Sequence, residues 1–258
     1  MRKIVIGNWK MQLGVVESVE IASKIARALA STPPSVTIAL CPTHAALFPV
    51  AAAKLSFKSS FLIGSQDLST EQKGAFTGEV SGRELKEMGV QLVLVGHSER
   101  RHSLGETPAV VAKKLQAAFF AKLTPVLCVG ESLSDRTGGR WKNTLQEQLL
   151  TAFGSLNATS PRDLYVAYEP VWAIGTGKSC SLGDAEEAIR FIRAVVARSF
   201  GERWVRQKLS LLYGGSVDTK NAQEFFSSAE IDGVLVGGAS LQAKSFIQIV
   251  SQAARSTV

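Results

Sequence analysis

The sequence predicts an α/β fold made of a single (β/α)8 barrel over residues 1–258. Short runs rich in Val, Ile and Leu recur along the chain, and each is followed by a polar or Gly/Pro break and a longer stretch with helical spacing. The runs are nearly continuous in apolar residues rather than alternating, which is typical of parallel strands covered on both faces. A length of 258 residues and a hydrophobic content of 45% suit one such barrel with a full core.

Eight runs have the length and composition of buried strands. They cover residues 3–7, 36–41, 61–64, 92–95, 125–129, 164–168, 209–213 and 233–236. No linker or low-complexity stretch divides them, so we expect one domain.

Four of the intervening segments carry apolar residues at three-and-four spacing with charged residues between them, as amphipathic helices do. These segments are 19–29, 110–121, 145–153 and 185–200. The last follows Ser181 and Asp184, and an acidic residue there suits a helix N-terminus. Strand then helix, repeated, implies a parallel sheet with right-handed crossovers. Both a closed barrel and a doubly wound open sheet satisfy this pattern.

The residues that follow the strands favour the closed barrel. Polar or glycine-rich groups come after six of the eight strands, and barrel active sites are assembled from such groups around the whole ring. An open sheet would concentrate them at one switch point. The turn after the first strand, residues 7–10, is also not the G-x-G-x-x-G turn of dinucleotide-binding sheets.

Charge and cysteine content argue against several function classes. The formal net charge is +7, but the basic residues are scattered without a block of five, so we expect no nucleic-acid partner. The three cysteines, Cys41, Cys128 and Cys180, are an odd number without C-x-x-C spacing, which predicts neither disulfides nor a metal site. The apolar run near the N-terminus is too short for a signal peptide or a membrane span. We therefore expect a cytoplasmic protein with no membrane partner.

Three side chains at strand ends are candidates for catalysis. Lys10, after the first strand, would direct an ammonium group into the barrel mouth, where it can pair with a phosphate or an oxyanion; an exposed surface lysine is the alternative. His97 alone among the histidines ends a buried run, and a catalytic or a structural role fits it equally. His44 and His102 are expected at the surface. Glu169, at the end of the sixth strand, is a candidate general base.

The segment after Glu169 has the composition of a lid. Its apolar residues would be unfavourable on a permanently open loop, and its glycines allow movement and close approach to a ligand. The residues are Pro170, Val171, Trp172, Ala173, Ile174, Gly175, Thr176 and Gly177.

Two glycine turns follow the last two strands, at Gly214-Gly215-Ser216 and at Gly237-Gly238. Backbone N–H groups at such turns bind phosphate, and barrels often place a phosphate site there. The pair of turns predicts a phosphorylated ligand.

Seven segments resemble the signature segments of the triosephosphate isomerase family, in the family's order and over almost the whole chain. They are residues 7–11, 74–79, 96–101, 128–131, 168–177, 213–217 and 233–239. The resemblance implies a TIM barrel that interconverts dihydroxyacetone phosphate and D-glyceraldehyde 3-phosphate by proton transfer through an enediolate, in glycolysis and gluconeogenesis, without a cofactor.

The resemblance also implies a role for each site residue. Glu169 would be the base, and His97 the neutral electrophile that polarises the carbonyl. Lys10 would stabilise negative charge. The substrate-binding residues would be Asn8, Gly175, Ser216, Gly237 and Gly238, the last four through their N–H groups. Cys128 would be structural, and Glu131 and Ser98 would be hydrogen-bonding partners of the lid and of the base.

The resemblance further implies a homodimer through the loop from Gly74 to Glu79. Phe76 on this glycine-flanked loop would expose an aromatic ring in a monomer. Gln12 and Asp67 stand near the expected contact where the family usually has asparagine. Asp67 would pair with Lys10 or with a basic residue of the partner subunit.

Two other functions share some of these features. Another phosphosugar-binding barrel enzyme would have the phosphate turns but no need for Lys10, His97 and Glu169 at their strand ends. A catalytically inactive barrel used as a binding module would be expected to lose those three residues, and all three are present.

Overall fold

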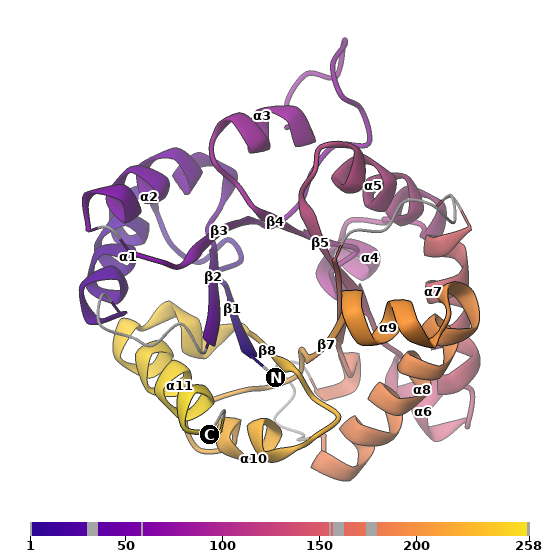
Figure 1. Ribbon diagram of the computed structural model, residues 1–258. Helices are drawn as coiled ribbons and strands as arrows, with labels where there is room; N and C mark the ends of the chain where they lie inside the picture. Colours follow the sequence, from indigo (N-terminus) through magenta and orange to yellow (C-terminus); the bar gives the residue numbers. More distant parts are fainter. Residues whose placement is uncertain are drawn as a thin grey trace.

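The computed structural model describes residues 2–29, 36–57, 59–154, 156, 163–173 and 180–256. Eight parallel strands form one closed barrel in sequential order, from β1 to β8 and back to β1, and the helices surround it (Figure 1). The strands are β1 Lys3–Asn8, β2 Val36–Cys41, β3 Leu62–Ser65, β4 Leu92–Val95, β5 Thr124–Val129, β6 Leu164–Tyr168, β7 Leu209–Tyr213 and β8 Gly233–Val236. The predicted (β/α)8 barrel is confirmed, and every predicted strand agrees within one residue at each end.

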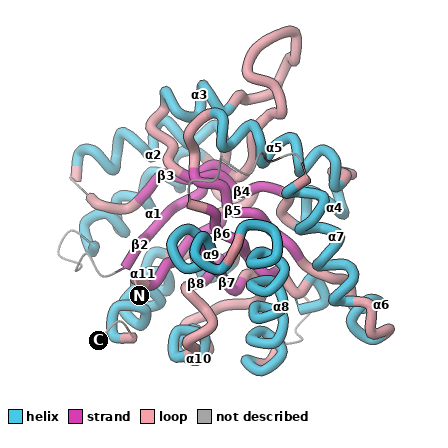
Figure 2. The backbone as a smooth tube through the Cα atoms, turned by 45° about the vertical axis from the view of Figure 1, so that its right-hand side comes forward, coloured by secondary structure: helices cyan, strands magenta, loops and turns pink. Residues whose placement is uncertain are grey.

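The helices cover the outside of the barrel and alternate with the strands (Figures 1 and 2). They are α1 Val15–Leu29, α2 His44–Ser56, α3 Gly82–Glu87, α4 Ser98–Ser103, α5 Pro108–Phe120, α6 Leu133–Thr137, α7 Trp141–Phe153, α8 Leu182–Phe200, α9 Glu202–Lys208, α10 Ala222–Ser227 and α11 Ala243–Arg255, with 3-10 turns η1 Val171–Ala173 and η2 Gly238–Leu241.

The four predicted helices are present, and each begins two to four residues before its predicted start. The first turn of a helix is set by its cap rather than by apolar spacing. In α8, for example, the Asp184 N–H donates to the Ser181 hydroxyl at 3.1 Å, and Ser181 is the N-cap. Helices of five to seven residues, such as α4 and α6, are too short to show a helical period in the sequence.

Two apolar layers explain the continuous hydrophobic runs of the strands. Alternate strand residues, among them Ile4, Ile6 and Leu94, form one cluster made of strand residues alone. The residues between them, such as Val5 and Val93, belong to the larger cluster with the helices. Each strand is therefore apolar on both faces.

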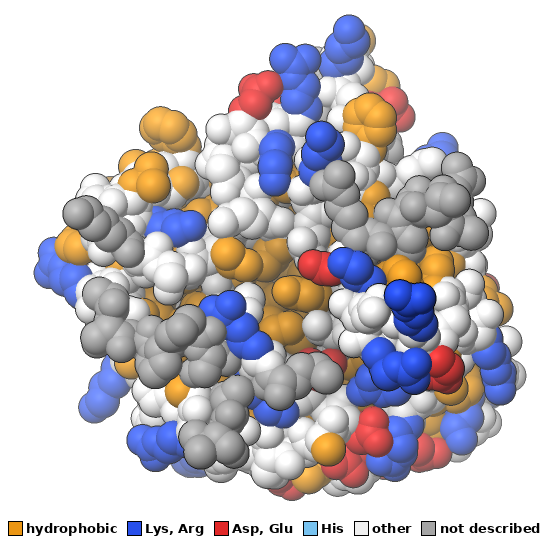
Figure 3. Space-filling model, viewed as in Figure 1, with side chains coloured by type: hydrophobic (Ala, Val, Ile, Leu, Met, Phe, Trp, Pro, Cys, Tyr) orange, Lys and Arg blue, Asp and Glu red, His pale blue; other side chains and the backbone are white. Residues whose placement is uncertain are grey.

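The basic side chains are not gathered in one patch on the visible face (Figure 3). On the face that Figure 3 shows, Lys and Arg side chains are scattered and mixed with acidic ones. None of the helices in the described part of the chain is long and apolar enough to cross a bilayer. Between β3 and α3 a long loop projects from the body of the barrel (Figures 1 and 2), and Phe76 on it is exposed.

Two sequence-based expectations were wrong. His44 is half-buried rather than at the surface, and its Nε2 lies 3.0 Å from both the Ser65 hydroxyl and the Asp67 carbonyl oxygen. Asp67 does not pair with Lys10, the first of its two expected partners; the second, a basic residue of the partner subunit, stays a prediction. Its carboxylate oxygens each accept from the Lys114 ammonium at 2.7 Å, and one lies 2.9 Å from Arg100 Nη2.

Asp67 belongs to a buried network of two acids and two bases. Glu106 accepts from Arg100 Nε at 2.5 Å and also from Lys114. The network joins the end of β3 to α4 and α5, and Lys114 is almost fully buried. Burial raises the pKa of Glu106, but the hydrogen bonds from Lys114 and Arg100 outweigh this and hold it below its ordinary value.

We predict that Lys114→Met destabilises the protein by about 3–5 kcal/mol, because Asp67 and Glu106 are left buried with only one cation. A group whose pKa is lowered in the folded state stabilises it at neutral pH, and this contribution is lost as pH falls through the lowered pKa. Burial holds the pKa of Asp67 above its ordinary value even with both cations present. The variant lacks the Glu106 contribution and its carboxyls gain protons more readily, so the difference in stability between variant and wild type should be largest near neutral pH and should shrink as pH falls. Urea titrations at several pH values measure both effects. Lys113→Met, at an exposed neighbour, is the control and should stay within about 0.5 kcal/mol. Equal stability of the two variants would contradict the prediction.

Candidate active site

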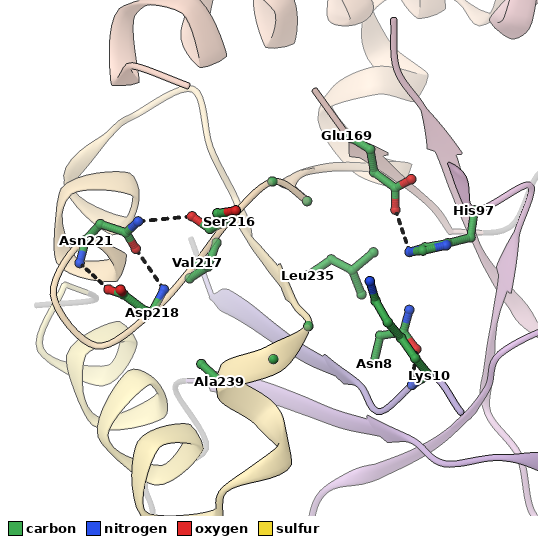
Figure 4. A pocket seen from close by; sticks show the side chains of 14 residues that line it. Asn8, Lys10, His97, Glu169, Ser216, Val217, Asp218, Asn221, Leu235 and Ala239 are labelled. Carbon is green, nitrogen blue, oxygen red and sulfur yellow. Dashed lines mark hydrogen bonds and ion pairs between the residues drawn. The ribbon is translucent and has the colours of Figure 1, made fainter. Parts of the chain in front are cut away.

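A cavity of about 330 Å³ lies at the carboxyl ends of the strands. It brings together the three catalytic candidates and those substrate-binding candidates that the structure describes: Asn8, Lys10, His97, Glu169, Ser216, Gly237 and Gly238 (Figure 4). Gly175, the remaining candidate, lies outside the described residues. Groups from β1, β4, β6, β7 and β8 thus share one cavity, as expected for a barrel site.

Glu169 is held from several sides. Its backbone N–H donates to the Val129 carbonyl at 2.7 Å, and a Cβ at Gly130 would lie only 1.7 Å from the Glu169 carbonyl oxygen, so no other residue fits there. The carboxylate is 1% exposed, and its Oε2 accepts from the Ser98 N–H at 2.9 Å. The other oxygen, Oε1, accepts no hydrogen bond from the described residues. One carboxylate oxygen is therefore anchored, and the other is available to take a proton.

His97 faces that oxygen. Its Nε2 lies 3.3 Å from Glu169 Oε1 (Figure 4). His97 is the N-cap of α4, and its Nδ1 accepts from the Glu99 N–H at 3.3 Å. A nitrogen that accepts a hydrogen bond carries no proton, so the proton of the neutral ring is on Nε2. The ring can thus donate a hydrogen bond into the cavity.

Lys10 has a left-handed backbone, with φ of 51°, which costs a residue other than glycine free energy. Two hydrogen bonds hold this conformation: the Lys10 N–H donates to Asn8 Oδ1 at 3.0 Å, and Gln66 Nε2 donates to the Lys10 carbonyl at 2.7 Å. The ammonium pairs with Glu99 at 2.7 Å. Gln66 and Glu99 were not singled out as site residues from the sequence. Glu99 lies two residues after His97, and that proximity was the one available signal.

The opposite side of the cavity is formed by the two glycine turns. Gly214, Gly215 and Ser216 line it together with Gly237 and Gly238. A Cβ at Gly215 would lie 2.2 Å from the Tyr213 hydroxyl, whereas one at Gly238 would meet nothing within 4 Å. Gly215 is therefore required by packing, whereas the absence of a side chain at Gly238 leaves the cavity wall open.

The structure describes the predicted lid from Pro170 through Ala173. The other residues predicted for it, Ile174, Gly175, Thr176 and Gly177, lie outside the described residues. Trp172 Nε1 donates to Glu131 Oε1 at 2.8 Å, and the Ser216 hydroxyl donates to the Ala173 carbonyl at 2.8 Å. Glu131 and Ser98 thus make the contacts expected of them, to the lid and to the base. Burial raises the pKa of the Glu131 carboxyl.

Comparison with known proteins agrees with this site. The family model of triosephosphate isomerase matches residues 3–253. The chain is 43% identical to a triosephosphate isomerase of Moorella thermoacetica over 250 residues, which cover 97% of this chain and 98% of that protein. It is 42% identical over 251 residues to one of Carboxydothermus hydrogenoformans, with 97% and 98% covered, and 39% identical over 252 residues to one of Chloroherpeton thalassium, with 98% and 99% covered. Similarity of this extent, with this barrel and this cavity, shows that the chain belongs to the triosephosphate isomerase family.

Proposed function

We propose that this chain is an enzyme, a triosephosphate isomerase, which interconverts dihydroxyacetone phosphate and D-glyceraldehyde 3-phosphate. The observation that carries the proposal is the arrangement of a buried carboxylate with one unbonded oxygen, Glu169, next to a histidine that can donate from Nε2, His97. Both face a cavity whose far wall consists of two glycine turns. Family membership supports the same activity.

The reaction is a proton transfer between two adjacent carbons. Glu169 takes the proton from the carbon next to the carbonyl, while His97 donates a hydrogen bond and then its Nε2 proton to the carbonyl oxygen. The histidine retakes a proton from the neighbouring hydroxyl, and Glu169 returns its proton to the other carbon. Protons and charge balance within the substrate and these two residues, so no redox partner is required.

The other candidate residues bind the substrate phosphate or stabilise the charge of the enediolate. Lys10 lines the cavity, and we assign its ammonium the role of stabilising the enediolate charge. Asn8 holds the Lys10 backbone in place. The N–H groups of four residues bind the substrate phosphate: Gly175, Ser216, Gly237 and Gly238.

Three buried thiols are free, those of Cys41, Cys128 and Cys180, and free thiols suit a reducing compartment. We therefore place this single-domain enzyme in the cytoplasm, where it would act in glycolysis and gluconeogenesis.

We also propose a homodimer through the loop from Gly74 to Glu79. The projecting loop exposes Phe76, and other large apolar side chains are exposed on segments that follow the first four strands: Met11, Val16, Phe48 and Leu104. Scattered apolar residues need no partner, but exposed apolar side chains on each of the segments that follow four consecutive strands favour an interface.

Glu169→Gln should lower kcat about 10²- to 10⁴-fold, because the amide cannot take the substrate proton. Binding of inorganic phosphate should stay within about twofold, since the glycine turns are unchanged. A coupled assay of triose phosphate isomerisation in the presence of EDTA measures the first effect. Glu202→Gln, at an exposed carboxylate of α9 that does not line the cavity, is the control. Near-normal kcat in the Glu169 variant would remove this residue from the mechanism, and inactive but folded wild-type protein would overturn the proposed function.

Replacing Phe76 by Asp should turn the dimer into a weakly active monomer at micromolar concentration, because a carboxylate would have to be buried in the interface. Sedimentation velocity measures the change. Leu150→Asp is the matched control, since Leu150 on α7 is 46% exposed and Phe76 is 48% exposed. A wild-type protein that sediments as a fully active monomer would rule the interface out.

Deleting residues 174–177 should slow isomerisation and raise the fraction of substrate that appears as methylglyoxal and inorganic phosphate. An enediolate phosphate in contact with water can expel its phosphate, and we assign the segment after Ala173 the role of excluding water from it. The two products are measured separately in the same reaction. Slower turnover with an unchanged elimination fraction would limit the segment to a role in binding.

A further inference from the structure

The backbone pairing between β4 and β5 ends two residues before His97. Its last pair is Val95 opposite Leu127. Gly96 follows with a left-handed backbone, φ of 68°, and a residue in that conformation cannot continue a strand. β5 itself continues to Val129. Beyond Val95, contacts other than the parallel ladder therefore have to fix the distance between the two strand ends.

Arg101 bridges the two strand ends at this point. Its Nε donates to the Gly96 carbonyl at 2.7 Å, and its Nη2 donates to the Cys128 carbonyl at 2.9 Å. Gly96 and Cys128 are the residues that follow the last pair of the register, Val95 opposite Leu127. A guanidinium carries its donors in one rigid plane, so its two hydrogen bonds fix the distance between the two carbonyls.

The two carbonyls adjoin the groups that place the proposed catalytic pair. The first belongs to the residue before His97, whose Nε2 lies 3.3 Å from Glu169 Oε1. The second belongs to the residue before Val129, whose own carbonyl accepts from the Glu169 N–H at 2.7 Å. The end of β4 thus carries the histidine, and the end of β5 holds the base. The spacing that Arg101 fixes is therefore the spacing between these two side chains.

The guanidinium lies in a place without room for water. Arg101 and Glu169 line one small cavity, which is too small to admit a water molecule. A Cβ at Gly96 would lie 2.7 Å from Arg101 Nη2, so a side chain there would displace the guanidinium. Burial lowers the pKa of Arg101, and the nearby charge of Glu169 partly offsets this. No water in this cavity can take the place of the arginine on the two carbonyls.

We propose that Arg101 is a positioning residue, whose guanidinium holds the ends of β4 and β5 at the spacing that His97 and Glu169 need to act on one substrate. The inference rests on the proposed isomerase function, since it concerns the two residues assigned to the proton transfer. The preceding residue, Arg100, cannot take this role, because its partners are the carboxylates of the buried network. A misplacement of about 1 Å between reacting groups can cost about 10²-fold in rate.

The first test is Arg101→Ala, which removes both hydrogen bonds. We expect kcat per folded protein to fall at least about tenfold, because His97 and Glu169 lose their relative placement. KM should stay within about threefold, since the glycine turns assigned to the phosphate follow β7 and β8 and are unchanged. Circular dichroism and a urea titration give the folded fraction. Arg198→Ala, at an exposed arginine of α8 that does not line the cavity, is the control and should keep kcat within about twofold.

Chemical rescue separates positioning from loss of structure. Arg101→Ala removes a guanidinium and leaves space of the same shape between the two carbonyls. Guanidinium chloride at about 20 mM, far too little to unfold a protein, should raise kcat of this variant several-fold and leave wild type unchanged. Sodium chloride at the same concentration is the control for ionic strength. Arg101→Lys keeps the charge but not the planar fork, so its kcat should lie between those of wild type and Arg101→Ala, and it serves if the alanine variant does not fold.

Three outcomes overturn the proposal. The first is a fall in kcat of less than about tenfold in folded Arg101→Ala. The second is a rise in KM as large as the fall in kcat, which would indicate lost binding rather than lost placement. The third is activity that neither added guanidinium nor the Arg101→Lys substitution recovers. Failure of the proposed function would differ from all three, because wild-type protein would then not isomerise triose phosphate at all.

Discussion

Pairing of β1 with β8 closes the barrel, and the geometry of the cavity depends on this closure. The register runs from Ile4 opposite Gly233 to Gly7 opposite Val236. A Cβ at Gly233 would lie 2.1 Å from the Ile4 carbonyl oxygen, so the strands approach each other only because this residue is glycine. Closure brings Lys10, just after β1, next to Gly237, just after β8. The side chain proposed to stabilise charge and a turn proposed to bind phosphate therefore line one cavity, although the two residues stand at opposite ends of the chain.

Within the barrel, α4 is the element that contacts all three proposed catalytic residues. Its N-cap is His97, its first N–H anchors Glu169, and Glu99 pairs with Lys10. A helix of six residues has little stability of its own, so its position depends on tertiary contacts.

Two consecutive arginines of α4 supply those contacts. Arg100 enters the buried network with Asp67 and Glu106, and Arg101 donates to the Gly96 and Cys128 carbonyls at 2.7 and 2.9 Å. Two charged side chains outside the proposed catalytic set thus fix the helix that carries His97, through contacts with residues at or just after the carboxyl ends of β3, β4 and β5.

The architecture and the residues at the strand ends could be predicted from the order of amino acids alone. Continuous apolar runs identify strands buried on both faces, and parallel strands in a barrel direct their carboxyl ends to one rim, so Lys10, His97 and Glu169 could be named and placed near one another. How their atoms pair could be seen only in the folded structure. The partners of Asp67, the half-buried position of His44, the unbonded oxygen of Glu169 and the site contacts of Gln66 and Glu99 all depend on side chains from different strands and helices. Hydrogen bonds and ion pairs act over about 3–4 Å, and such distances between residues far apart in the chain are set by packing, which no local pattern of residues encodes.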